Sequence, residues 1–138
     1  MTDAADVTYE GTMLEALGVR QVEMTKDLVV MELDIGPKVL QPMGILHGGA
    51  SSVLAESAAS MGAFMNCDPE SQFAVGIDLN ISHLKSKREG VLRATATPIR
   101  KGRNIHVWNV DLTDEGDDLV AKARLTVLIK TWDSQKGA

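Results

Sequence analysis

Residues 39–67 read VLQPMGILHGGASSVLAESAASMGAFMNC, and this stretch decides the fold. Between Gly48 and about Asn66 the residues are almost all small or apolar, which predicts a helix about 28 Å long, enclosed on most sides by other structure. Glu56 is the only Asp, Glu, Lys or Arg in the stretch. A carboxylate buried in such a helix loses hydration, so it persists only if it is paired, protonated or used. Glu56 is therefore the first candidate for a functional residue.

Polar neighbours on the same helix support a site at Glu56. Ser52 and Ser60 lie four residues before and after it, so a polar stripe follows one helical face. An isolated buried acid would need only a neutralising partner, whereas a stripe of polar groups favours a lined cavity. We therefore expect Glu56 to face a cavity.

The sequence His47-Gly48-Gly49 stands at the predicted helix start, about two turns upstream of Glu56. Its glycines either relieve crowding in a tight turn or expose backbone N–H groups at a helix N-terminus. Exposed N–H groups and the helix dipole would stabilise negative charge that develops on a carbonyl oxygen. Gln41 precedes this turn, and its amide is suited to hold the same carbonyl or a water. His83, at the end of a predicted strand, faces either the site or solvent.

Strand patterns flank the helix on both sides. Thr12 to Leu17 predicts a short helix ended by Gly18. After the long helix, apolar residues alternate with others in the sequence. This pattern places five side chains on one face of a strand: Phe73, Val75, Ile77, Leu79 and Ile81. The predicted strands are Val19–Met24, Leu28–Ile35, Phe73–Ser82, Gly90–Ile99, Asn104–Thr113 and Leu119–Thr131. Because short turns join the last four, we expect them to form an antiparallel meander.

One long apolar helix with strands before and after it predicts an α+β fold. A strongly curved antiparallel sheet that wraps around the helix buries it without a second layer. At 138 residues, the chain suits a single domain over residues 1–138. We expect its first eleven residues to be flexible.

Composition excludes several classes of protein. A net charge of -5 argues against general nucleic-acid binding. No apolar run reaches about 18 residues, so no membrane span is expected. The polar, acidic start does not resemble a signal peptide, which predicts a cytoplasmic protein. The lone Cys67 excludes an internal disulfide and a cysteine-rich zinc site, and we expect neither a metal nor a cofactor.

Two basic clusters stand at predicted strand ends. Their charged members are Lys85, Lys87 and Arg88 in the first and Arg100, Lys101 and Arg103 in the second. Charged turns are common, so each cluster alone predicts little. Together they could converge on one phosphate-rich ligand. Since neither GxxxxGK[ST] nor GxGxxG is present, the expected ligand keeps its phosphates on the surface and sends a reactive arm inward, as coenzyme A does.

The segment QPMGILHGGASSVLAESAAS, residues 41–60, resembles the hotdog-fold acyl-CoA thioesterases. The nearest branch contains phenylacetyl-CoA, 4-hydroxybenzoyl-CoA and 1,4-dihydroxy-2-naphthoyl-CoA thioesterases, and the likeness covers nearly the whole chain. The resemblance implies hydrolysis of an acyl-CoA, preferably with an aromatic acyl group, to the free acid and coenzyme A. It also implies that Glu56 acts as nucleophile or general base, and that the Gly48 N–H binds the thioester oxygen. Gly49, the next residue, would contact the substrate.

The same resemblance implies roles for further residues. Gln41 and His47 would line the site, and Ser60 would help to place the attacking water. Glu56 and Ser60 of one chain would face Gln41 and Gly48 of another in a homodimer, and dimers would pair into homotetramers. Coenzyme A phosphates would meet residues 83–88, including His83, and residues 100–103. Met43 and Leu84 depart from the family pattern, in which an aromatic residue and a second histidine are common.

Two other functions are open at this point. The chain could be a non-catalytic acyl-CoA-binding domain, or a hotdog hydratase or dehydratase of enoyl or 3-hydroxyacyl thioesters. The latter enzymes use a histidine with an acid, and the HGG spacing fits them poorly. The acyl group is also open: aromatic residues make up only 4% of the chain, so short or medium aliphatic acyl groups are not excluded.

Overall fold

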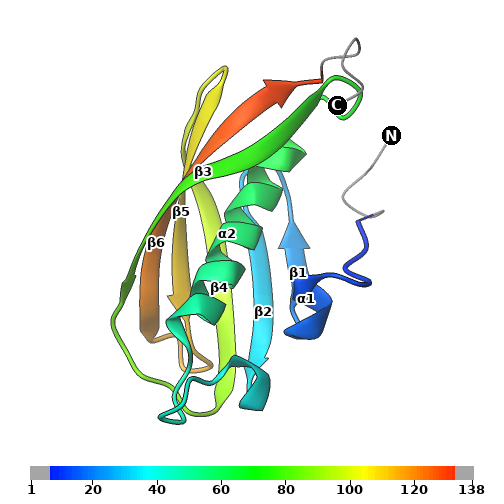
Figure 1. Ribbon diagram of the computed structural model, residues 1–138. Coiled ribbons are helices and arrows are strands. Elements are labelled where there is room, and N and C mark those ends of the chain that lie inside the picture. Colours follow the sequence, from blue (N-terminus) through cyan, green and yellow to red (C-terminus); the bar gives the residue numbers. More distant parts are fainter. Residues whose placement is uncertain (1–6, 133–138) are drawn as a thin grey trace.

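The computed structural model describes residues 7–132, which form one curved antiparallel sheet around one long helix (Figure 1). The helices are α1 (Met13–Ala16) and α2 (Gly48–Met65), with a 3-10 turn at Pro37–Val39. The strands are β1 (Arg20–Met24), β2 (Val29–Ile35), β3 (Gln72–His83), β4 (Gly90–Lys101), β5 (Ile105–Thr113) and β6 (Leu119–Thr131). This hotdog arrangement confirms the predicted α+β fold. No helix among the described residues has the length and apolar character that a membrane span requires.

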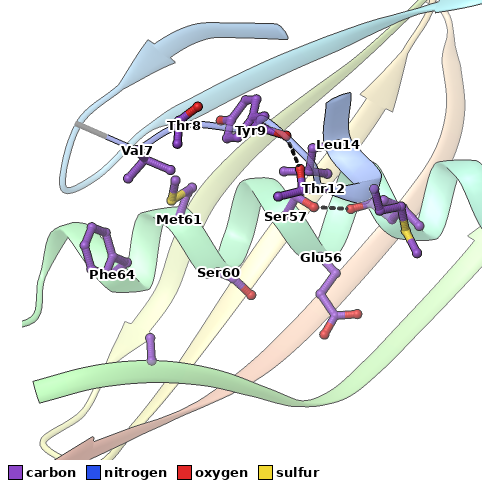
Figure 2. Close-up of a pocket in the computed structure, with 13 residues that line it drawn as sticks. Val7, Thr8, Tyr9, Thr12, Leu14, Glu56, Ser57, Ser60, Met61 and Phe64 are labelled. Carbon is purple, nitrogen blue, oxygen red and sulfur yellow. Dashed lines mark hydrogen bonds between the residues drawn. The ribbon is translucent and has the colours of Figure 1, made fainter. Parts of the chain in front are cut away.

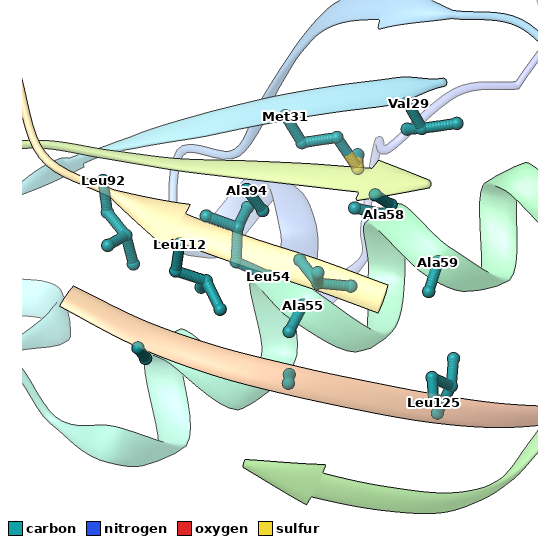
Figure 3. Packing of buried hydrophobic residues seen from close by; sticks show 14 of the residues in the cluster. Val29, Met31, Leu54, Ala55, Ala58, Ala59, Leu92, Ala94, Leu112 and Leu125 are labelled. Carbon is teal, nitrogen blue, oxygen red and sulfur yellow. The ribbon is translucent and has the colours of Figure 1, made fainter. Parts of the chain in front are cut away.

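Small residues let α2 lie close against the sheet. Its buried face consists of Ala50, Ser51, Leu54, Ala55, Ala58, Ala59, Gly62 and Ala63. The approach is close at Gly62, where an added Cβ atom would lie 2.5 Å from the ring of Trp108. Around these residues Leu92, Leu112 and Leu125 are fully buried (Figure 3). Burying such a side chain contributes about 1.5–3 kcal/mol, so this face anchors α2.

The order of strands differs from the predicted meander. The sheet runs β1-β2-β4-β5-β6-β3, so β3 pairs with β6 and lies at an edge. The prediction that β3 pairs with β4 is wrong, whereas the β4-β5-β6 meander is confirmed. Residues 84–89 separate β3 from β4, and a link longer than a tight hairpin lets the chain cross to the middle of the sheet. There β4 pairs with β2 over Val29–Ile35.

A β-bulge also corrects the predicted faces of β3. Gly76 pairs with Val127 but Asp78 pairs with Thr126, so one extra residue lies between them. An extra residue reverses the alternation of side chains. Ala74 therefore packs on the core before the bulge, as do Leu79 and Ile81 after it. Val75 and Ile77 are exposed, so the prediction of a single apolar face on β3 is wrong.

Candidate active site

The open face of α2 carries a cleft of about 790 Å³. Its lining residues are Val7, Thr8, Tyr9, Thr12, Met13, Leu14, Val53, Glu56, Ser57, Ser60, Met61, Phe64 and Ala74. Figure 2 shows Glu56 and Ser60 pointing from α2 toward β3, while Val7, Thr8 and Tyr9 pass on the other side of the helix. Apolar walls with a few convergent polar groups are typical of a small-molecule site.

Glu56 is exposed on the single chain, so the expected burial of its carboxylate is wrong. The sheet covers one face of α2, and on the other face the described residues include only the segment that carries Val7, Thr8 and Tyr9. Among residues 7–132, no hydrogen bond or ion pair engages the Glu56 carboxylate. The acid therefore lies at the cleft without a partner that would neutralise it. This is the state that a nucleophile or general base requires.

The serines of α2 differ in what their hydroxyl groups do. Ser52 donates to the carbonyl of Gly48 at 2.9 Å, and Ser57 donates to that of Val53 at 2.6 Å. Both hydroxyls are therefore hydrogen-bonded to backbone carbonyls one turn earlier in the same helix. Ser60 makes no such bond within the described part of the chain and points the same way as Glu56 (Figure 2). Ser60 is thus the hydroxyl of the polar stripe that is free to hold a water or a substrate atom.

The start of α2 presents one free backbone donor. His47 is the N-cap, and its Nδ1 accepts a hydrogen bond from the Gly49 N–H at 2.7 Å. The Gly49 donor is therefore already used. No acceptor for the Gly48 N–H is found among the described residues. The side chain of His83 lies against Gly48, since a Cβ atom there would lie 2.8 Å from the His83 Nε2.

Gly48 and His83 border a second cavity of about 270 Å³. It is also lined by Ile45, Leu46, Ser51, Leu84, Lys85, Ser86 and Val120. Gln41 lines neither cavity, because its Oε1 accepts from the Met43 N–H and its side chain closes its own turn. The chain therefore holds Glu56 with Ser60 in one cavity, and Gly48 with His83 in another. Glu56 lies eight positions after Gly48, which is about 12 Å along α2.

The lysines of the first basic cluster are paired with acids of the β5–β6 turn. Lys85 contacts Asp114 at 2.7 Å and Asp118 at 2.8 Å, and Lys87 contacts Glu115 at 2.8 Å. Hydrogen bonds to these partners raise the pKa of Lys85 and hold that of Asp114 well below its usual range. The hydrogen bond from Lys87 lowers the pKa of Glu115 to about 2. A phosphate would have to compete with these carboxylates.

The second basic cluster lies at the other end of α2. Lys101 contacts Asp27 at 2.5 Å and Asn66, the C-cap of α2, at 3.1 Å. Arg100 and Arg103 are exposed beside it. Arg88 of the first cluster instead donates to the Gly44 carbonyl at 3.4 Å, before α2 begins. Within a single chain the two clusters therefore lie at opposite ends of α2, and their convergence on one coenzyme A stays a prediction.

Several cleft residues were not predicted from the sequence. Phe64 follows Ser60 by one turn, so helical spacing could have identified it. Tyr9 had no such signal, because it belongs to the segment expected to be flexible. In the structure Tyr9 packs against the core, its hydroxyl donates to Gln21 at 2.9 Å, and burial raises its pKa. Residues 1–6 of that segment lie outside the described part.

Comparison with known proteins identifies the family. A family model for the thioesterase superfamily matches residues 43–121. A 1,4-dihydroxy-2-naphthoyl-CoA hydrolase of Listeria monocytogenes is 40% identical over 116 residues, covering 84% of this chain and 94% of the relative. The putative esterase ComA2 of Bacillus subtilis is 42% identical over 118 residues, covering 86% and 94%.

Solved structures of similar proteins have the same fold. A mutant thioesterase of Pseudomonas aeruginosa has a TM-score of 0.87 at 31% identity, covering 90% of this chain and 89% of that chain. A mutant protein of Staphylococcus aureus has a TM-score of 0.85 at 34% identity, covering 87% and 99%. The fold and these matches together define a thioester hydrolase of the hotdog class. The chain belongs to the thioesterase superfamily, which confirms the predicted family and class of enzyme.

Proposed function

We propose that this protein hydrolyses an acyl-CoA thioester to a free acid and coenzyme A, in a site shared by two copies of the chain. The observation that carries the proposal is the unpaired Glu56 carboxylate beside the free Ser60 hydroxyl in an apolar cleft. The free Gly48 donor lies about 12 Å away on the same helix, too far for one carbonyl group to reach both. A second copy that presents its Gly48 and Gln41 to this cleft completes the site.

The mechanism follows from these groups. The thioester oxygen binds the Gly48 N–H of the second copy, at the positive end of α2, where negative charge is stabilised. Glu56 then attacks the carbonyl carbon to give a mixed anhydride that water cleaves. Alternatively, it takes a proton from a water held by Ser60, and the oxygen of that water attacks the carbonyl carbon. In either route the C–S bond breaks and the thiolate leaves with the electron pair. The steps require neither a metal nor a cofactor.

Two engineered relatives support the same residues. In two crystal structures of the S. aureus protein, a glutamate and a glutamine fifteen residues apart are each replaced by alanine. Gln41 and Glu56 of this chain have the same separation. A glutamine is also replaced in the P. aeruginosa thioesterase. These choices of position suggest that a glutamine–glutamate pair matters in the relatives, and we propose the same for Gln41 and Glu56.

We propose an aromatic acyl group as the preferred substrate. The volume of the cleft is within the range of about 300–1,000 Å³ that is usual for ligand pockets. Phe64 and Tyr9 give it two aromatic walls, which the low aromatic content of the chain did not indicate. Relatives from L. monocytogenes and Escherichia coli are named 1,4-dihydroxy-2-naphthoyl-CoA hydrolase.

The test is release of free thiol from benzoyl-, phenylacetyl-, 1,4-dihydroxy-2-naphthoyl- and straight-chain CoA esters. We expect Glu56→Gln to lower kcat by about 10²-fold or more, as the loss of a general base does. Glu70→Gln, at an exposed position in the turn after α2, is the control and should keep wild-type turnover. Wild-type turnover in Glu56→Gln would overturn the proposal. Saturable acyl-CoA binding without thiol release would instead indicate a binding domain.

A further inference from the structure

We infer that Gly76 of β3 is a positioning residue for Glu56, because its missing side chain leaves the space that the carboxylate occupies. The inference rests on the proposed role of Glu56. Figure 2 shows Glu56 extending from α2 toward β3, so the strand forms the surface on which the carboxylate lies. Nothing in the sequence pattern of β3 marks Gly76 as part of a site.

The contact itself is close. A Cβ atom placed on Gly76 would lie 2.6 Å from Oε1 of Glu56 and 3.5 Å from its Cδ. Real Cβ atoms essentially never approach another heavy atom to less than 3.0 Å. The other neighbour, Cδ1 of Leu125 at 3.4 Å, is at an ordinary contact distance. An added methyl group would therefore displace the flexible carboxylate and leave the core in place.

A positive φ angle does not explain the glycine at position 76. Gly11, Gly18, Gly44 and Gly90 have positive φ angles, whereas Gly76 does not. Glycine within a strand weakens it and usually marks a bulge or a close approach by another group. Both occur here, since the bulge follows Gly76 and the carboxylate lies over it. Alanine would suit the strand at this position as well or better.

The placement matters because little else holds the carboxylate. Within residues 7–132 it accepts no hydrogen bond and joins no ion pair, so the close contact with β3 is what limits the rotamers open to Glu56. A displacement of about 1 Å at a reacting group can lower a rate by about 100-fold. Moving the acid would therefore impair the chemical step while leaving the apolar cleft, and with it substrate binding, largely unchanged.

The experiment compares Gly76→Ala with Gly36→Ala. Gly36 is a matched control, because it has an extended backbone and no atom lies within 4 Å of its added Cβ. For Gly76→Ala we expect kcat for the best CoA ester to fall at least tenfold, KM to change less than twofold, and Tm to stay at or above the wild-type value. Gly36→Ala should match the wild type in kcat and KM. A crystal structure of Gly76→Ala should show the Glu56 carboxylate displaced from β3.

Three results would overturn the inference. Wild-type kcat in Gly76→Ala would show that the space is not needed. An unmoved carboxylate in its crystal structure would show that the methyl group acts elsewhere. A Tm well below that of the wild type would show that the added methyl group disturbs the packing of the fold and not only the Glu56 carboxylate. If Glu56→Gln itself kept full activity, the proposed function would fail instead, so the two failures are distinguishable.

Discussion

At the scale of single residues, Gly48 offers a test of the donor that polarises the carbonyl. It is the first residue of α2, where proline is tolerated because that N–H has no partner in the helix. His47 already has the extended conformation that a residue before proline needs, with φ -71° and ψ 128°. Gly48→Pro therefore removes the N–H and keeps the helix. We expect kcat to fall by about 10²–10³-fold, the loss seen when one oxyanion donor is removed.

The matched variant is Gly48→Ala, which keeps the N–H. Its methyl group meets the same His83 imidazole that the proline ring would meet, and the exposed imidazole can turn aside. Steady-state thiol release should therefore show a small loss for alanine and a large one for proline. Equal losses in the two variants would mean that crowding against His83, and not the missing donor, lowers the rate.

At the scale of elements, the turn between β5 and β6 fixes the segment that precedes β4. Glu115 accepts from Lys87 at 2.8 Å and from the Val91 N–H at 3.1 Å, which lowers its pKa from 4.5 to about 2. Because the folded pKa is depressed, the stability that Glu115 contributes is complete above pH 4.5 and is lost as the pH falls toward 2. Lys85 has a raised pKa, so its contribution is lost only at high pH.

Urea unfolding between pH 5 and pH 2 tests this assignment. The free energy of unfolding of the wild type should exceed that of Glu115→Gln at pH 5, and the difference should shrink as the pH approaches 2. Lys87→Met should also reduce the pH dependence in this interval, because it removes the main cause of the pKa shift. A difference between wild type and Glu115→Gln that stayed constant with pH would contradict the assignment.

The elements also show what the sequence can and cannot predict. The small-residue stripe and the single acid of α2 predicted the helix, the curved sheet and the position of Glu56 on a cavity. They did not predict its exposure, because pattern alone does not say how many faces of a helix are covered. The bulge after Gly76 has no local signal, since Val75 and Ile77 continue the apolar alternation. Likewise, pairing of β3 with β6 depends on contacts distant in sequence.

At the scale of the whole molecule, the single chain leaves surfaces exposed that a second copy could cover. The open face of α2 carries an exposed acid, and β3 lies at the sheet edge with Val75 and Ile77 exposed. A long unpaired edge strand is a liability that proteins usually cover. A second copy related by two-fold symmetry would cover both features and bring Gly48 to the partner's Glu56. We expect such a homodimer to be the smallest active unit, with pairing into tetramers a further step.

Mixing two inactive variants tests the shared site directly. Glu56→Gln lacks the acid and Gly48→Pro lacks the donor, so in a mixed dimer one site has both defects and the other has none. Random pairing makes about half of the dimers mixed, and about a quarter of all sites are then intact. Co-expressed variants should therefore recover about a quarter of the wild-type kcat, although each alone has about a hundredth or less. If acid and donor served the same site within one chain, the mixture would be no more active than its components.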